Sequence, residues 1–184
     1  KKVLEEILGK NFKGTIVCVG WNAYSEYTTR IQRCWAHLLR EAKHLAEKFQ
    51  SGFNLHEGIK KIYAKVKAIT FKECYENRKK LYDRLIVELK QWVEYANCYT
   101  ELRKFAVKIN NGLEYFFTRV LNPQIEATNN TAERALREHV VIRKIIGTLR
   151  NEKGTSIHEI IMTMFATWKK QGLNLFTELK ARLS

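Results

Sequence analysis

Hydrophobic positions repeat at helical spacing over most of the chain, with strand-like spacing in one region near the N-terminus. A short first helix is predicted, with one apolar face formed by Val3, Leu4, Ile7, Leu8 and Phe12. Residues 15–19 then form a continuous, mostly β-branched run, which is typical of a strand buried on both faces. Residues 30–35 predict a second strand, followed by a helix that begins near Ala36. This order predicts part of an α/β layer with a parallel sheet.

From about residue 54 to residue 121 the apolar pattern is helical throughout, which predicts two or more antiparallel helices packed face to face. The first apolar face consists of Ile59, Ile62, Tyr63, Val66 and Ile69, and the longer second one of Leu81, Leu85, Leu89, Trp92, Val93, Ala96 and Leu102. After Pro123, a helix is predicted to begin with Asn130 as its N-cap and Glu133 completing a capping-box pattern. Two final helices are expected at about 155–170 and 173–183, separated by Gly172.

The charge of the chain indicates what kind of partner it binds. The 184 residues include 33 Lys and Arg against 19 Asp and Glu, a net charge of +14. Such a surplus favours a polyanionic partner, nucleic acid first and an anionic membrane surface second. Residues 59–80, read as one basic helix, hold eight Lys and Arg and two Glu. This segment, with Lys60 and Lys61, is either a solvated face or a face that contacts DNA phosphates.

Several protein classes are excluded by composition. No apolar run has the length of a membrane span, and the first ten residues lack the apolar centre of a signal peptide. The four cysteines are far apart and include no CxxC pair, so neither a disulfide framework nor a standard zinc site is indicated. We therefore expect a cytoplasmic protein without a membrane partner.

Four sequence blocks, in one order, resemble the catalytic domain of the insertion-sequence-66 type of bacterial and archaeal transposases. They are GTIVCVGWNAY at 14–24, IQRCWAHLLRE at 31–41, TNNTAERALREHVVIRKIIG at 128–147 and TWKKQGLNLFTEL at 167–179. The resemblance implies an α/β, ribonuclease-H-like core with a large helical insertion, predominantly helical overall. Residues 1–50 would be the C-terminal part of the core, 51–121 the insertion, and 122–184 the core-completing helices. It also implies DNA as partner, at transposon ends and target, in a prokaryotic, nucleoid-associated setting.

The resemblance further implies a metal site of two Asp and one Glu, holding Mg²⁺ or Mn²⁺ for cleavage and transfer of DNA strands. The family's Glu falls on Glu133, whereas Val19 occupies the position of its second Asp. The first Asp lies upstream of the block that resembles residues 1–12, outside this chain. Asp83 is the only Asp in the sequence, and its place in the insertion predicts a solvated residue. We therefore expect no tight metal binding and no catalysis by this chain alone.

Other side chains are candidates for contact with DNA. The candidates in the third block are Asn129, Asn130, Arg134, Arg137, Arg143 and Lys144. The two Asn are predicted to position a phosphate or the carboxylate, or to begin the helix, and the four cations to contact the strand backbone without reading sequence. His37 is expected near the C-terminal end of the second strand, either touching a phosphate or a metal-bound water or holding a structural hydrogen bond. Cys34 and His37 form a CxxH pair, but no second pair of zinc ligands is visible.

Two other functions stay open at this point. One is a non-catalytic DNA-binding or regulatory remnant of a transposase, and the other is a helical protein-interaction module. Self-association into a homo-oligomer is also expected, because the strand at 15–19 would have an unpaired edge without the strands that precede it in the family.

Overall fold

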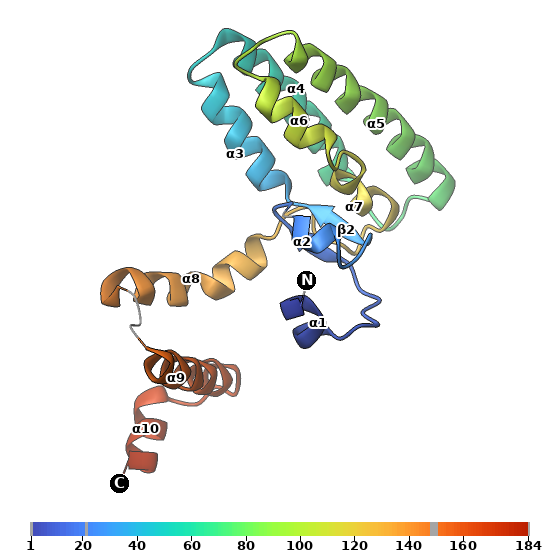
Figure 1. The fold of residues 1–184 in the computed structure, drawn as a ribbon. Coiled ribbons are helices and arrows are strands. Elements are labelled where there is room, and N and C mark those ends of the chain that lie inside the picture. Colours follow the sequence, from blue (N-terminus) through green and yellow to red (C-terminus); the bar gives the residue numbers. More distant parts are fainter. Residues whose placement is uncertain (1, 21, 148–150, 184) are drawn as a thin grey trace. The chain divides into compact units, whose positions relative to one another are not determined.

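The computed structural model describes residues 2–20, 22–147 and 151–183, and these form a predominantly helical protein (Figure 1). The described residues contain ten α-helices, one 3-10 helix and two strands. By its internal contacts the chain divides into unit 1, Lys1–Thr131, and unit 2, Ala132–Ser184. The division into core, insertion and core-completing helices concerns ancestry and stays a prediction. None of the described helices is long and apolar enough to cross a membrane.

The two strands of unit 1 pair in parallel, which confirms the predicted orientation. β1 (Ile16–Cys18) and β2 (Ile31–Arg33) are in register from Ile16 opposite Ile31 to Cys18 opposite Arg33. The short helix α2 (Asn22–Ser25) lies between them in the sequence. The larger ribonuclease-H-like sheet is not seen in the described residues, which form this two-stranded sheet.

Both strands are shorter than predicted. β2 ends at Arg33, before Cys34. The N–H of Trp35 donates to the Ala127 carbonyl at 3.0 Å and not to β1, and Trp35 begins a helix instead. The prediction that the first strand is buried on both faces was wrong: in β1 only Cys18 is buried. Ile16 and Val17 are only partly buried, and the described residues give β1 one neighbouring strand, so it lies at an edge of the described sheet.

The first helix is also shorter than the pattern suggested. α1 (Lys2–Leu8) ends before Phe12, whose ring instead stacks on Tyr27 with a centroid distance of 6.3 Å. Val3 and Ile7 are exposed, so the predicted apolar face of this helix is not buried. Helical periodicity therefore identified the helix and failed to identify its partner surface.

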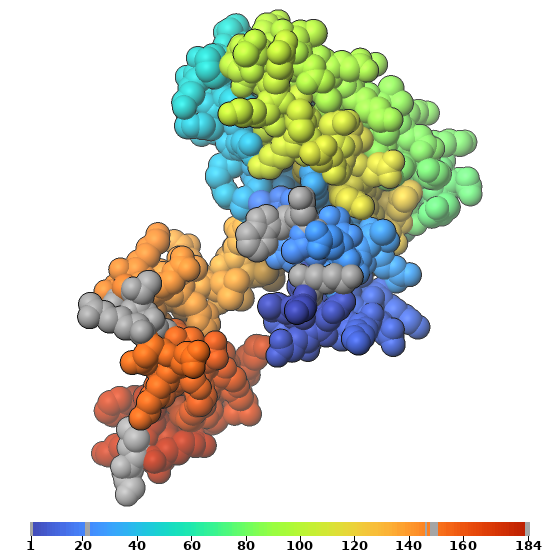
Figure 2. Space-filling view, viewed as in Figure 1, coloured from blue at the N-terminus to red at the C-terminus, as the bar shows by residue number. Residues whose placement is uncertain are grey.

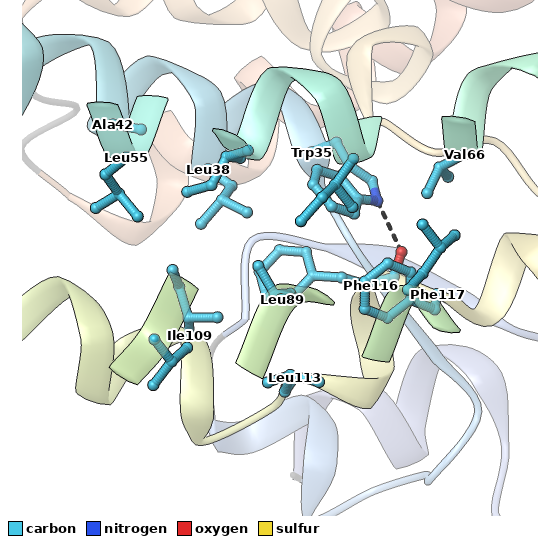
Figure 3. Close-up of a cluster of buried hydrophobic side chains, with 14 of the residues drawn as sticks. Trp35, Leu38, Ala42, Leu55, Val66, Leu89, Ile109, Leu113, Phe116 and Phe117 are labelled. Carbon is cyan, nitrogen blue, oxygen red and sulfur yellow. Dashed lines mark hydrogen bonds between the residues drawn. The ribbon is translucent and has the colours of Figure 1, made fainter. Parts of the chain in front are cut away.

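The core of unit 1 lies in the predicted helical block, where successive helices pack side by side (Figures 1 and 3). The elements are α3 (Trp35–Ala46), α4 (Gln50–Ala68), α5 (Tyr75–Asn97), α6 (Arg103–Asn110), η1 (Glu114–Phe116) and α7 (Thr118–Leu121). Nearly all apolar residues predicted for the two helical faces belong to this core, several of them without any exposed surface. Burial of this face stabilises unit 1 far more than helix propensity does.

Two polar side chains join the sheet to the helical core. The Trp35 indole N–H donates to the Phe116 carbonyl at 2.7 Å (Figure 3). Gln32 is fully buried, and its amide donates to the same carbonyl at 3.0 Å while accepting from the Arg119 N–H at 2.7 Å. Because these buried polar groups are paired, their hydrogen bonds offset the cost of desolvation, and the contact holds the sheet against η1 and α7.

The described residues of unit 2 form helices and the turns that end them. Its elements are α8 (Asn130–Ile146), which begins at the end of unit 1, α9 (Glu152–Lys170) and α10 (Leu175–Leu183). α9 begins earlier than the predicted residue 155, because the Asn151 side-chain oxygen accepts a hydrogen bond from the Gly154 N–H at 2.7 Å and caps the helix.

The predicted break between the last two helices is confirmed at Gly172. Its φ of 72° lies in the left-handed region that favours glycine, and the next residue, Leu173, donates its N–H to the Trp168 carbonyl at 2.9 Å. This arrangement satisfies a carbonyl at the end of α9 and directs the chain into α10.

Candidate functional site

The carboxyl ends of the two parallel strands form one edge of the sheet, and several predicted site residues lie there. Val19 follows β1 and is 44% exposed, so its side chain reaches solvent at this edge. Gly20 comes next with a φ of 98°, and a Cβ atom at this position would lie 2.9 Å from the Arg33 Nε atom. The backbone therefore requires glycine at position 20 and presents the side chain at position 19 outward.

Cys34 and His37 lie where β2 leads into α3, as predicted for the strand's C-terminal end. The His37 Nδ1 atom is 3.3 Å from the Cys34 sulfur, which also accepts a hydrogen bond from the Asn129 N–H at 3.4 Å. With the bond from Trp35 to Ala127, this contact attaches the segment that precedes α8 to the edge of the sheet. Asn129 thus acts through its backbone in positioning that segment, and its predicted contact with phosphate stays a prediction.

A half-buried cation, Arg33, lies beside this edge. Its Nη1 atom donates to the Lys108 carbonyl at 2.9 Å, and its guanidinium lies over the Phe116 ring at 5.7 Å. Burial lowers the pKa of Arg33, and burial raises the pKa of the neighbouring Cys18 thiol. The Arg33 side chain is therefore mainly packed against its neighbours at the end of β2 and is only partly in contact with solvent.

Arg119 is a positioning residue that sequence reasoning missed. Its Nη1 atom donates to the carbonyls of Pro123 and Ile125 at 2.9 and 2.6 Å, so it holds the loop that leads to α8. Its own backbone N–H is bound by the buried Gln32. No pattern in the sequence distinguishes this arginine from the others, because its partners are backbone carbonyls and not side chains.

Glu133 lies in the first turn of α8 and is half-exposed. The predicted basic residues lie along the same helix. Arg137 and Lys144 follow Glu133 by 4 and 11 positions, which places all three on one face of the helix. Arg134 and Arg143 fall roughly 80–100° to either side of that face, at 100° per residue. All four cations are exposed, so α8 presents positive charge on the side that carries the carboxylate and on both flanks.

The basic segment 59–80 is not the single helix that was predicted. α4 ends at Ala68 because Ile69 is extended and buried, and α5 begins only at Tyr75. Lys60 pairs with Glu57, at 2.8 Å between Nζ and Oε1. Lys61 is exposed, and no carboxylate of the described residues pairs with it. Of the two predicted phosphate contacts, Lys60 forms an ion pair with Glu57, whereas Lys61 forms none within the described residues and interacts with Glu57 only at longer range.

A family model described as "Transposase IS66 family" matches residues 1–157. The chain belongs to this family. The match covers unit 1 and all of α8, and so includes Val19, His37 and Glu133. No curated protein and no solved structure matches the chain. The function of this IS66 transposase chain is therefore related to transposition of mobile elements.

The IS66 transposases belong to a class that generally uses divalent metals, and the donor set of this chain does not fit such a group. Val19 offers no oxygen ligand, and among the described residues no three His, Cys, Asp or Glu side chains gather as metal ligands. Asp83 lies exposed on α5 and pairs with Lys79 at 2.9 Å, as expected for a solvated residue. One carboxylate, that of Glu133, competes poorly with water for Mg²⁺.

Proposed function

We propose that this chain has the catalytic-domain architecture of an IS66 transposase and binds DNA, but does not by itself cleave or transfer strands. The observation that carries the proposal is Val19, an aliphatic side chain exposed at the end of a parallel strand in a member of a metal-using transposase class. Glu133 is proposed as the inherited metal-ligand position. The ribonuclease-H-like core is proposed from ancestry, with β1 and β2 as its described strands.

DNA binding is proposed from charge. The net charge is +14, and Arg137 and Lys144 lie on the Glu133 face of α8 with exposed neighbours on either side. Lys61 adds an exposed cation on α4. Contacts of these side chains with phosphate would give affinity and position without sequence preference.

A nicking assay tests the catalytic half of the proposal. Supercoiled plasmid is incubated with the wild-type chain in Mg²⁺ or Mn²⁺, in parallel with Glu133→Gln and with a metal-free control. All three reactions are expected to show the same background. Metal-dependent nicking by the wild-type chain that Glu133→Gln abolishes would overturn the claim of inactivity. Val19→Asp serves as the matched variant, because nicking gained there and lost in Val19→Asp/Glu133→Gln would identify position 19 as the vacated ligand position.

A regulatory remnant is the second candidate, and the exposed Val19 favours it because DNA binding without cleavage is what a competitor for transposon ends requires. Excess wild-type chain is then expected to reduce transposition by an intact IS66 transposase, and a variant lacking Arg137 and Lys144 to do so less. No reduction by the wild-type chain would remove this role. Self-association and a nucleoid-associated location remain predictions, the first of which sedimentation velocity measures.

A further inference from the structure

The turn that joins α4 to α5 exposes two aromatic side chains. We define the hairpin tip as residues 67–75, between the last turn of α4 and the first residue of α5. Ile69 is buried and anchors the base of the tip, whereas Phe71 is 72% exposed and Tyr75 53% exposed. A Phe that is so exposed contributes little to the core and leaves an aromatic face open to solvent.

The hairpin tip and the first turns of α5 carry more cations than carboxylates, although Glu73 and Glu76 lie among them. Lys67, Lys72 and Lys80 are exposed, and no carboxylate of the described residues pairs with any of them. Their neighbours differ, because Lys65 pairs with Glu88 and Lys79 with Asp83. Exposed lysines that form no ion pair with a described carboxylate therefore flank Phe71 on both sides in sequence, in slight excess over Glu73 and Glu76.

The hairpin tip lies at the end of the helical bundle that carries the sheet (Figure 1). On α4, Tyr63 stacks on Trp35, the first residue of α3, with ring centroids 5.5 Å apart. On α5, Tyr82 contacts Phe117 at 6.3 Å, directly before α7. Figure 2 shows the start of α5, in green, at the outer margin of unit 1.

We propose that Phe71 is a stacking platform for an unpaired DNA base, with Lys67, Lys72 and Lys80 binding the phosphates around it. The ligand class is single-stranded or locally melted DNA. Stacking on an aromatic ring requires a base face that duplex DNA keeps within its own stack, and it tolerates any sequence. The excess of exposed lysines over carboxylates around the tip favours a polyanion over an apolar protein partner. This inference rests on the proposed DNA-binding function and deepens it.

The test compares single-stranded and duplex oligonucleotides of equal length, at one salt concentration, by fluorescence anisotropy with the full chain. Phe71→Ala is expected to weaken single-strand binding by about 5- to 140-fold, the equivalent of 1–3 kcal/mol for one stacked base. Duplex binding is expected to change less than about 2-fold. Phe71→Trp keeps the platform and is expected to retain single-strand affinity. Phe176→Ala, which removes a Phe that is 77% exposed on α10, is the matched control and should change neither affinity.

A photocrosslinking measurement supplies a direct readout. A single strand that carries bromodeoxyuridine is expected to crosslink at Phe71 in the wild-type chain, and the peptide is identified by mass spectrometry. Crosslinking only at positions outside the hairpin tip would overturn the inference.

The failures of the two proposals are distinguishable. If the wild-type chain binds both DNA forms with steep salt dependence while Phe71→Ala changes them equally or not at all, the stacking site is wrong and DNA binding stands. If the wild-type chain binds neither form at low salt, both proposals fall. If Phe71→Ala abolishes self-association in sedimentation and leaves DNA binding unchanged, the hairpin tip is a protein contact and the stacking site is wrong.

Discussion

Units 1 and 2 are both helical, and they differ in how much apolar surface they bury. Unit 1 has a continuous core around Trp35, with many side chains lacking any exposed surface. In the described part of unit 2 only Met162 and Trp168 are buried among the apolar residues. The large apolar residues exposed in this described part are Leu136, Val140, Val141, Ile145, Ile157, Ile160, Ile161, Leu173 and Phe176. Helix formation is thus decided by the same periodicity in both units, whereas burial distinguishes them.

The contacts between side chains inside the described part of unit 2 mainly involve residues exposed to solvent. Glu138 on α8 pairs with Lys169 on α9 at 2.6 Å, and both side chains are about two-thirds exposed. The Arg182 guanidinium lies over the Trp168 ring at 4.9 Å. Exposed ion pairs stabilise little, so the caps at Asn151 and Gly172 matter more to these helices than such contacts do.

The largest expected difference between the two units is in the rate of amide hydrogen exchange. Amides in the middle of α4 and α5 are expected to exchange at least about 1,000-fold more slowly than those in α8 and α10, because the former open only by unfolding the core of unit 1. Mass spectrometry of deuterated peptides measures the difference. Equal protection in α5 and α8 would mean that unit 2 is stabilised by more than its described contacts.

Removal of one tryptophan from each unit tests the same contrast by stability. Trp35→Ala is expected to cost about 3–5 kcal/mol, since it leaves a cavity in the core and removes the hydrogen bond to Phe116. Trp168→Ala is expected to cost clearly less, because few buried neighbours surround it in unit 2. Guanidinium denaturation followed by circular dichroism gives both values, and similar losses for the two variants would contradict the contrast.

Gly58→Ala tests how closely the core of unit 1 is packed. Alanine is the better helix former, yet a Cβ atom at this position of α4 would lie 2.0 Å from the Trp92 ring. The expected result is a loss of about 1–3 kcal/mol through overpacking, measured by the same denaturation. A stabilised variant would show that α4 and α5 have room to separate.

The smallest expected effect is a pH dependence from His56. Burial, and then the charge of Lys60, lowers the pKa of His56 below its ordinary value of 6.5, although Glu57 opposes the shift. The folded state therefore binds this proton less readily than the unfolded state, so the contribution to stability is present above pH 6.5 and is lost as the pH falls through the folded pKa. The thermal midpoint of His56→Asn is expected to depend less on pH between pH 7 and 5 than that of the wild-type chain. If the thermal midpoint of His56→Asn depends on pH as strongly as that of the wild-type chain, His56 is not the source of the pH dependence.

Much of this fold could be predicted from the sequence because apolar periodicity reports local structure. The parallel strand pair, the helical block and the break at Gly172 are all as predicted. Element ends were less predictable, because tertiary hydrogen bonds set them: the N–H of Trp35 binds a carbonyl 92 positions away, and buried Ile69 interrupts the basic segment.

For the candidate site, the residue types could be predicted and their roles only in part. Val19 and His37 lie at the expected edge, since parallel strands bring their carboxyl ends together. The backbone role of Asn129 and the loop contacts of Arg119 could not be predicted, because both depend on carbonyls and sulfur that the fold brings near. The exposed Phe71 emerged only when the basic segment proved to be a hairpin.

The central claim is that this IS66 family chain binds DNA through its exposed cations. Its most direct test is a titration of the affinity for a duplex oligonucleotide against salt concentration. We predict a straight line of log K against log salt with a slope of about −3 or steeper, equivalent to three or more phosphate contacts at about 0.9 each. A flat line, or no binding at low salt, would contradict the claim and favour the helical protein-interaction module.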